Sequence, residues 1–84
     1  MEVYVEITKK FTSDNSRIFR LNDTIEFSAV KEDGVVSVFR GVIVDITEEE
    51  VILKDATIDG TAVSSNQIVK YSAIKENTCK FVLK

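Results

Sequence analysis

The residues best suited to binding chemistry lie between positions 9 and 20, where basic and aromatic side chains are interleaved. They are Lys9, Lys10, Arg17, Phe19 and Arg20. Basic groups contact phosphates and aromatic faces stack on bases, so this set is the candidate for binding single-stranded RNA or DNA. The net charge of −3 opposes that reading, because a nucleic-acid-binding domain normally has a dominant basic footprint. The sequence therefore favours a salt-bridged surface with Phe11 and Phe19 in the core.

Catalysis by an activated nucleophile lacks its usual base in this chain. The sequence contains no histidine, so neither a serine nor the single cysteine, Cys79, has an imidazole to activate it. Cys79 alternates with Phe81 and Leu83, which predicts a buried, unreactive thiol, since free cysteine is among the most buried residue types. We predict no catalytic residues and a protein that is not an enzyme.

Acidic residues gather at Glu48-Glu49-Glu50 and again at Asp55 and Asp59. Carboxylates bind hard cations, but this spacing lacks the central glycine and the closing glutamate of a calcium loop. The glycines at positions 34, 41 and 60 are isolated from one another, so no glycine-rich phosphate loop is present. We therefore expect no metal and no cofactor.

The length of 84 residues predicts a single domain, 1–84, of modest stability. No apolar run approaches the roughly 20 residues that cross a bilayer, and Glu2 and Glu6 stand where a signal peptide would be apolar. One cysteine cannot form an internal disulfide, which is typical of cytoplasmic proteins. We expect a cytoplasmic location and no membrane partner. Residues 32–60 are strongly acidic, with eight acidic and two basic side chains.

Alternation of apolar and polar residues between turn residues predicts the secondary structure. In chain order, we expect a strand over 3–7, a loop over 12–16, strands over 24–31 and 35–47, a strand from about 51, a loop over 60–67, and short apolar segments over 68–74 and 79–83. Asp33-Gly34 and Asp59-Gly60 predict tight turns. Arg40-Gly41 interrupts the long strand and predicts a bulge or a sharp bend.

The apolar positions of these strands predict the core. In the strand over 35–47, one face carries Val36, Val38, Val42, Val44 and Ile46, and we expect that face to point inward. The predicted core residues are Val5, Ile25, Phe27, Val42, Val44, Ile46, Leu53, Ile74 and Phe81.

The run GVIVDITEEEVILKDATIDGTAVSSNQIV, from Gly41 to Val69, resembles the central strands of Sm-like small barrels. A glycine in a bent strand, an acidic turn, a return strand ending near Leu53, an Asp-Gly turn and a short closing segment, extending to about Ile74, follow in that order. The run is also similar to the Sm-like middle domain of small mechanosensitive channels, but residues 63–66 lack the proline usual there and no membrane helix precedes them. A channel is therefore not expected.

This resemblance implies the fold more than a binding site. In RNA-binding Sm proteins an Asp in the bent strand is followed by an Asn or an aromatic residue that stacks on a base, whereas Ile46 and Thr47 follow Asp45 here. In the bacterial chaperones of that family a histidine adjoins the closing strand, and Lys70 stands at that position beside Tyr71. The implied fold is all-β, a small SH3-like or Sm-like barrel of five or six short antiparallel strands with a bent third strand.

The predicted function is that of a non-catalytic interaction module. Small open barrels leave edge strands that pair readily with another chain, so we expect binding to a protein partner or to another copy of this chain. The alternative is an Sm-like protein that binds single-stranded RNA or DNA through the Lys9–Arg20 region. A phage or mobile-element protein that blocks a host factor also fits the size and the acidity, without a motif behind it.

Overall fold

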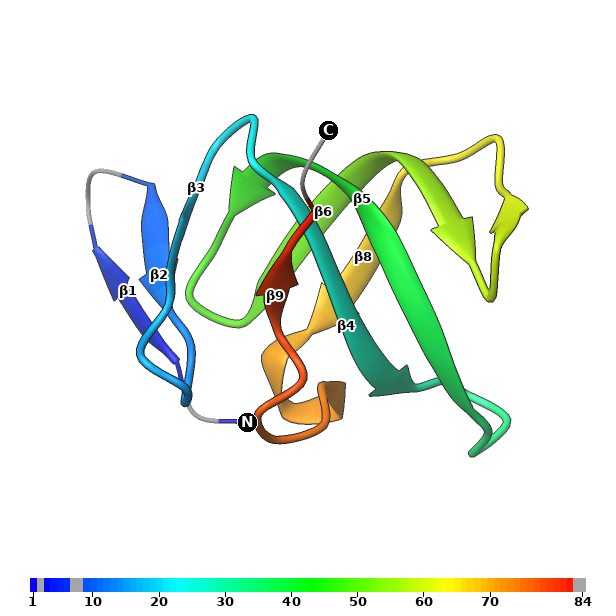
Figure 1. The fold of residues 1–84 in the computed structure, drawn as a ribbon, viewed down its shortest axis with the longest axis horizontal. Coiled ribbons are helices and arrows are strands. Elements are labelled where there is room, and N and C mark those ends of the chain that lie inside the picture. Colours follow the sequence, from blue (N-terminus) through cyan, green and yellow to red (C-terminus); the bar gives the residue numbers. More distant parts are fainter. Residues whose placement is uncertain (2, 7–8, 83–84) are drawn as a thin grey trace.

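The computed structural model describes residues 1, 3–6 and 9–82, and for residues 4–6 it describes the backbone alone. The predicted all-β class is confirmed: the strands form two antiparallel sheets, and one short 3-10 helix follows β8 (Figure 1). The elements are β1 (Tyr4–Glu6), β2 (Lys10–Thr12), β3 (Ile18–Arg20), β4 (Thr24–Val30), β5 (Val36–Ile46), β6 (Glu50–Ile58), β7 (Thr61–Ala62), β8 (Gln67–Lys70), the 3-10 helix η1 (Tyr71–Ala73) and β9 (Lys80–Phe81). Of these residues, none lies in a helix long and apolar enough to cross a bilayer.

The smaller sheet consists of β1, β2 and β3 in that order, and it lies at one end of the molecule (Figure 1). Phe11 of β2 is paired with Phe19 of β3 in the register, and both side chains are buried. The sequence prediction was wrong here because it assigned no strand to β2 or β3. Each of these strands has a single inward residue, so the two-residue period has no repeat that could reveal it.

The larger sheet has the order β7-β6-β5-β4-β9, and β8 also pairs with β6. The turn between β4 and β5 is the predicted Asp33-Gly34 hairpin, where the Lys31 N–H donates to the Val35 carbonyl at 2.9 Å. Gly34 has φ +83°, a conformation that glycine adopts without steric cost. A single bridge between Ala29 and Ile74 brings the segment after β8 back to β4. The hydrogen-bonded path does not close among the described strands, so the barrel remains a prediction.

The long strand β5 faces the core with the opposite set of residues from the one predicted. Phe39 and Ile43 are buried, whereas Val36 and Val38 are 49% and 40% exposed. Apolar residues occupy both faces of this strand. Because the inner face also carries the small residues Ser37 and Gly41, the sequence does not show which face points toward the core. Ile46 is buried as predicted, because a register shift between Ile43 and Asp45 adds one residue to β5 and inverts the alternation.

Gly41 lies opposite a second irregularity between β5 and β6. From Arg40 to Val42 the chain advances two residues, while its partner β6 goes from Thr57 to Lys54 and advances three. The extra residue therefore belongs to β6, near Asp55, whose φ is +49°. A Cβ at position 41 would lie 3.0 Å from the Leu53 Cβ and 3.0 Å from the Lys54 carbonyl oxygen. The sheet is irregular at Arg40-Gly41, as predicted, but the extra residue lies in β6 and not in β5. Glycine is required because the bulged backbone of β6 passes close to position 41.

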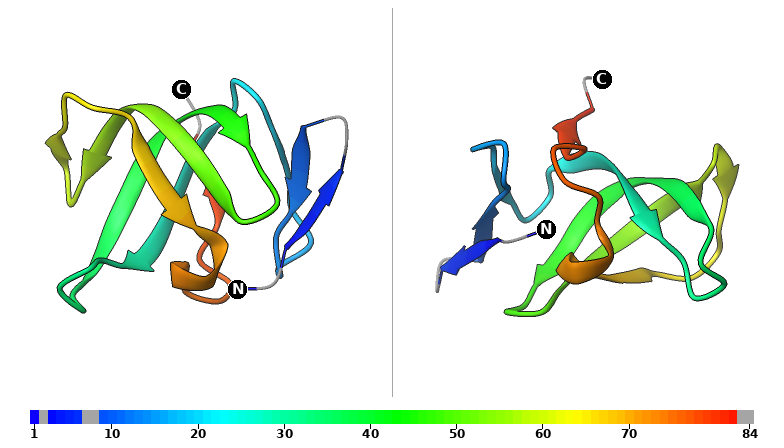
Figure 2. Two further views of the ribbon diagram at one scale, coloured as in Figure 1. Left: turned by 180° about the vertical axis from the view of Figure 1, so that it is seen from behind. Right: turned by 90° about the horizontal axis from the view of Figure 1, so that it is seen from below.

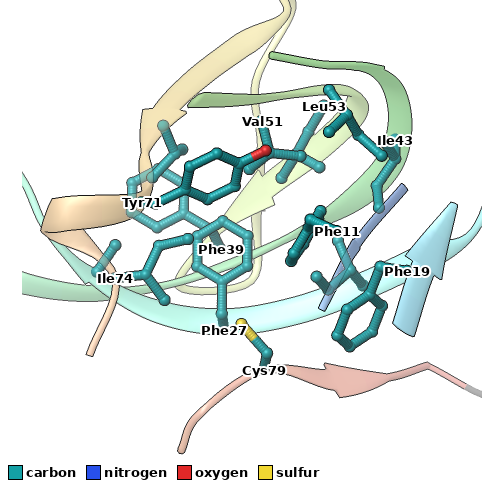
Figure 3. Packing of buried hydrophobic residues seen from close by; sticks show 14 of the residues in the cluster. Phe11, Phe19, Phe27, Phe39, Ile43, Val51, Leu53, Tyr71, Ile74 and Cys79 are labelled. Carbon is teal, nitrogen blue, oxygen red and sulfur yellow. The ribbon is translucent and has the colours of Figure 1, made fainter. Parts of the chain in front are cut away.

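The core collects residues from both sheets (Figure 3). Of the predicted core residues, those buried are Ile25, Phe27, Ile46, Leu53 and Ile74. Val42 and Val44 are half-buried because they lie on the outer phase of β5. Phe81 is 44% exposed, since β9 is an edge strand. The side chain of Val5 lies outside the described part of the structure, as does Leu83.

The small sheet lies beside the large one (Figure 2). Side chains from the 13–17 loop and from β2 and β3 attach it to the rest of the fold. The ring of Phe11 lies 5.2 Å from that of Tyr71, and the ring of Phe19 lies 4.5 Å from that of Phe81, measured between centroids. The backbone contributes where the turn before β4 meets β5: the Asn22 N–H donates to the Ile43 carbonyl at 2.8 Å.

Candidate functional site

The residues predicted to bind nucleic acid do not converge on one surface. Phe19 is fully buried, with its ring centroid 5.2 Å from that of Phe11, so its face is not available to a base. Lys10 and Arg20 are opposite each other in the β2–β3 register. Because cross-strand partners share a face and Phe11 and Phe19 alternate with them, Lys10 and Arg20 lie on the outer face of the small sheet.

The two remaining basic residues of that set make contacts within the fold. The Lys9 Nζ lies 3.2 Å from the Asp45 Oδ1 and 3.3 Å from the Ile46 carbonyl oxygen, to which it donates. The Arg17 Nη1 donates to the Cys79 carbonyl at 2.9 Å, and the Asn15 Nδ2 donates to the same oxygen at 2.9 Å. Both cations therefore connect the small sheet and its loop to the rest of the protein.

The carboxylates of Asp45 and Asp59 accept hydrogen bonds from backbone N–H groups, beside a bulge and in a turn respectively. The pKa of Asp45 is lowered by the backbone N–H of Ile46 and by Lys9, and the pKa of Asp59 is lowered by the N–H of Val38, which donates to its Oδ1 at 2.8 Å. Hydrogen bonds to the ionised form account for both shifts. Over residues 1, 3–6 and 9–82, no group of three or more His, Cys, Asp or Glu side chains is placed to hold a metal ion.

Cys79 is fully buried, as predicted. Burial raises the pKa of its thiol to about 12, with a smaller contribution from the charge of Asp14. The thiolate is the reactive form of cysteine, so this environment suits packing and not nucleophilic chemistry. The Cys79 sulfur lies 3.6 Å from that of Met1, and both Cys79 and Phe27 belong to the buried core (Figure 3).

A groove of about 860 Å³ is lined by residues of β8 and of the β4–β5 hairpin turn. Residues 30–33 of the hairpin form one wall and residues 67–70 of β8 form the other. The nearly buried side chains of Phe39 and Val69, each 6% exposed, form its floor together with Ile58. Ile68 on the β8 wall is 61% exposed, more than any other large apolar side chain in the described residues.

The β8 wall of this groove is also a free strand edge. Strand β8 pairs with β6 on one side, and no strand among the described residues pairs with its other side. The Tyr71 N–H donates to the Glu49 carbonyl, so in this antiparallel register Val69 and Gln67 also direct their backbone groups toward β6. Alternation then directs the N–H and C=O groups of Ile68 and Lys70 away from β6, toward an incoming strand.

Carboxylates outnumber cations around the groove. A second hollow of about 390 Å³ shares Lys70 and Ser72 with it. The charged residues that line the two are Lys31, Glu32, Asp33, Glu48, Glu49, Glu50 and Lys70. The groove itself, with three carboxylates and two lysines, has a formal side-chain charge of −1. Glu48 and Glu49 of the adjoining hollow bring the total for the two hollows to −3. Lys31 is also within 3.7 Å of Asp33, so its charge is partly compensated within the hairpin.

Sequence reasoning did not find this groove. The strand over 35–47 is apolar on both faces, but its exposed valines, Val36 and Val38, do not line the groove. Of this exposed patch, only Val30 of β4 borders it. The free edge of β8 has no sequence signal either, because it depends on which strands pair.

No protein-family model, curated protein or solved structure gives a significant match to this chain.

Proposed function

We propose that this chain is a non-catalytic interaction module that binds an extended segment of a protein partner by adding a strand to β8. The observation that supports this most directly is the free edge of β8, where outward backbone groups at Ile68 and Lys70 adjoin a groove with an apolar floor and charged walls. Strand addition derives affinity from such backbone groups and specificity from pockets for alternate side chains. The exposed side chain of Ile68 supplies apolar surface at the same place.

We also propose an SH3-like or Sm-like barrel as the architecture and the cytoplasm as the location. The bulges that bend β5 and β6 support a barrel, as does the Ala29–Ile74 bridge that returns the chain to β4. The single cysteine supports the location, since small secreted domains usually contain several disulfides. Binding of single-stranded nucleic acid has weaker support, because Phe19 is buried and Lys9 and Arg17 make contacts within the fold.

A proline at position 68 tests strand addition directly. The N–H of Ile68 does not pair with β6, so Ile68→Pro removes a group offered to the partner and leaves the β6–β8 pairing in place. Ile68→Thr is the matched control, because it keeps the N–H and the β-branched shape. The wild type and both variants are immobilised and exposed to nuclease-treated lysate. The wild type and Ile68→Thr should retain the same partner proteins, and Ile68→Pro should retain none of them.

Two controls keep the result interpretable. The thermal unfolding midpoint of Ile68→Pro should stay close to that of Ile68→Thr, which shows that the fold survives. Partners retained equally by the folded Ile68→Pro variant would contradict strand addition at β8. Partners that disappear on nuclease treatment of the wild-type sample would favour the nucleic-acid alternative.

A further inference from the structure

We infer that the partner segment is a single extended strand in which apolar residues alternate with lysine or arginine. This inference rests on the proposed strand addition at β8 and adds the chemistry of the occupant. It follows from three features of the groove: its two walls, its apolar floor and its acidic rim.

The two walls favour a single strand over the edge of a folded sheet. The hairpin residues 30–33 stand opposite β8 across the groove. A strand that enters there can pair with Ile68 and Lys70 on one side and lie against the hairpin on the other. Strand β8 of a second copy would arrive already paired with its own β6, and that neighbouring strand would meet the hairpin. An unpaired segment of another protein therefore fits better than a second copy.

The floor requires apolar side chains on one face of the incoming strand. Successive side chains of a strand point to opposite faces. Those on the inner face would meet Phe39, Ile58 and Val69, where an apolar residue gains burial and a charged one loses hydration. Alternation places the remaining side chains of the segment on the outer face, beside Ile68 and Lys70.

The rim determines the charge of those outer side chains. Glu32 lies on the hairpin wall, Glu50 lies opposite Lys70 in the β6–β8 register, and Glu48 and Glu49 border the adjoining hollow. The groove has a formal side-chain charge of −1, and the total is −3 when the adjoining hollow is included. Like charges on an acidic segment would therefore be repelled, and complementary charges would attract a basic one. The same field opposes a phosphate backbone, so RNA and DNA are poor occupants of this groove.

Two short peptides with blocked ends distinguish the charge preference from strand addition itself. The basic probe is Lys-Val-Thr-Val-Lys and its acidic twin is Glu-Val-Thr-Val-Glu. Each is titrated into the isotopically labelled full chain at low salt, and the backbone amide signals of Ile68 and Lys70 are followed by NMR. We expect the basic peptide to shift both amides and to bind at least about tenfold more tightly than the acidic twin, a difference of about 1.4 kcal/mol. Added salt should shrink the difference, because these charges are exposed to solvent.

Charge variants assign the preference to the groove. The double variant Glu32→Gln with Glu50→Gln should bind the basic peptide several fold more weakly than the wild type does. The salt dependence of this binding should also be smaller. Glu76→Gln, in an exposed turn outside the groove, should leave the affinity unchanged.

The outcomes separate this inference from the proposed function. If the acidic twin binds at β8 as tightly as the basic peptide, or the double variant binds as well as wild type, the basic partner is overturned and strand addition stands. If neither peptide shifts the amides of Ile68 and Lys70, or if Ile68→Pro binds them as wild type does, strand addition itself is overturned. Shifts of the same amides by a single-stranded oligonucleotide would overturn the charge argument.

Discussion

The larger sheet is joined strand to strand by its backbone, whereas the smaller sheet is attached to it chiefly by side chains. Strands β4 and β5 share seven consecutive register pairs, a pattern that local alternation and an Asp-Gly turn are enough to specify. The three-stranded sheet depends on Phe11 and Phe19 in a common core and on Arg17 and Asn15 at the Cys79 carbonyl. No local sequence pattern predicts such side-chain contacts between the two sheets. Their contribution to the free energy of unfolding can be measured by substituting residues in each sheet.

The largest expected effect tests whether the small sheet is part of the cooperative fold. Phe19→Ala removes a fully buried ring that contacts Phe11 and Phe81, and we expect it to lower the free energy of unfolding by about 3 to 5 kcal/mol. Urea denaturation followed by fluorescence and circular dichroism measures this loss, with Phe27→Ala in the large sheet as the matched control. A loss below about 1 kcal/mol would mean that the small sheet detaches without unfolding the rest.

A substitution at Gly41 tests the backbone of the larger sheet. Gly41→Val places side-chain atoms against the Leu53 Cβ and the Lys54 carbonyl, and we expect a loss of about 3 kcal/mol from overpacking. Gly34→Ala is the comparison, since position 34 has open space and its only penalty is a positive φ, roughly 1 kcal/mol. The denaturation midpoints of the two variants show which substitution costs more stability, and we expect it to be Gly41→Val. Equal losses would show that β6 can move away from Gly41.

The junction of the two sheets should show a dependence on pH. The pKa of Cys79 is about 12 in the folded protein and near 9 as its ordinary value, so the unfolded chain releases this proton first. Stability from this group is complete below pH 9 and declines as pH rises toward 12. Between about pH 9 and 10, we expect the free energy of unfolding to fall by about 1 kcal/mol. Cys79→Ala should remove that part of the decline, and an unchanged slope would contradict a buried thiol.

The smallest expected effect comes from replacing a buried serine in each sheet region: Ser13 in the loop of the small sheet and Ser37 in β5 of the large sheet. The Ser13 hydroxyl bonds to the backbone of Arg17. The Ser37 hydroxyl interacts with the Asp59 carboxylate and helps to lower the pKa of Asp59, but it makes no hydrogen bond of normal geometry within the described residues. Ser13→Ala should cost about 1 kcal/mol, while Ser37→Ala should change stability by less than about 0.5 kcal/mol or increase it. Thermal melting of the two variants is sufficient. A clear loss for Ser37→Ala would show that the hydroxyl forms a stabilising hydrogen bond with Asp59.

The sequence predicts best those parts of the fold whose information is local. Ile25 and Phe27 alternate cleanly in β4, and the Asp33-Gly34 and Asp59-Gly60 turns are where they were expected. The phase of β5 could not be predicted, because valines fill its outer face while Ser37 and Gly41 occupy part of its inner face. A count of apolar residues chooses the wrong side of such a strand.

The candidate site was less predictable than the fold. The basic and aromatic residues of 9–20 are adjacent in the sequence, but strand pairing turns Phe19 inward and Arg20 outward. Conversely, the groove combines the hairpin at 30–33 with β8 at 67–70, segments that no local pattern relates. Edge exposure follows from the pairing of the whole sheet, so it becomes visible only when the fold is complete.

The two bulges between β5 and β6 bear on how this chain can change length during evolution. One adds a residue to β6 near Asp55 and the other adds Val44 to β5, so the pairing at Ile46 and Val51 regains the register that it has at Phe39 and Ile58. Loss of either extra residue alone would slide one strand by a position and turn its later side chains to the wrong face. Loss of both would keep the register intact and straighten the pair. Homologues of this chain should therefore differ here by coupled deletions, one in each strand, and seldom by one alone.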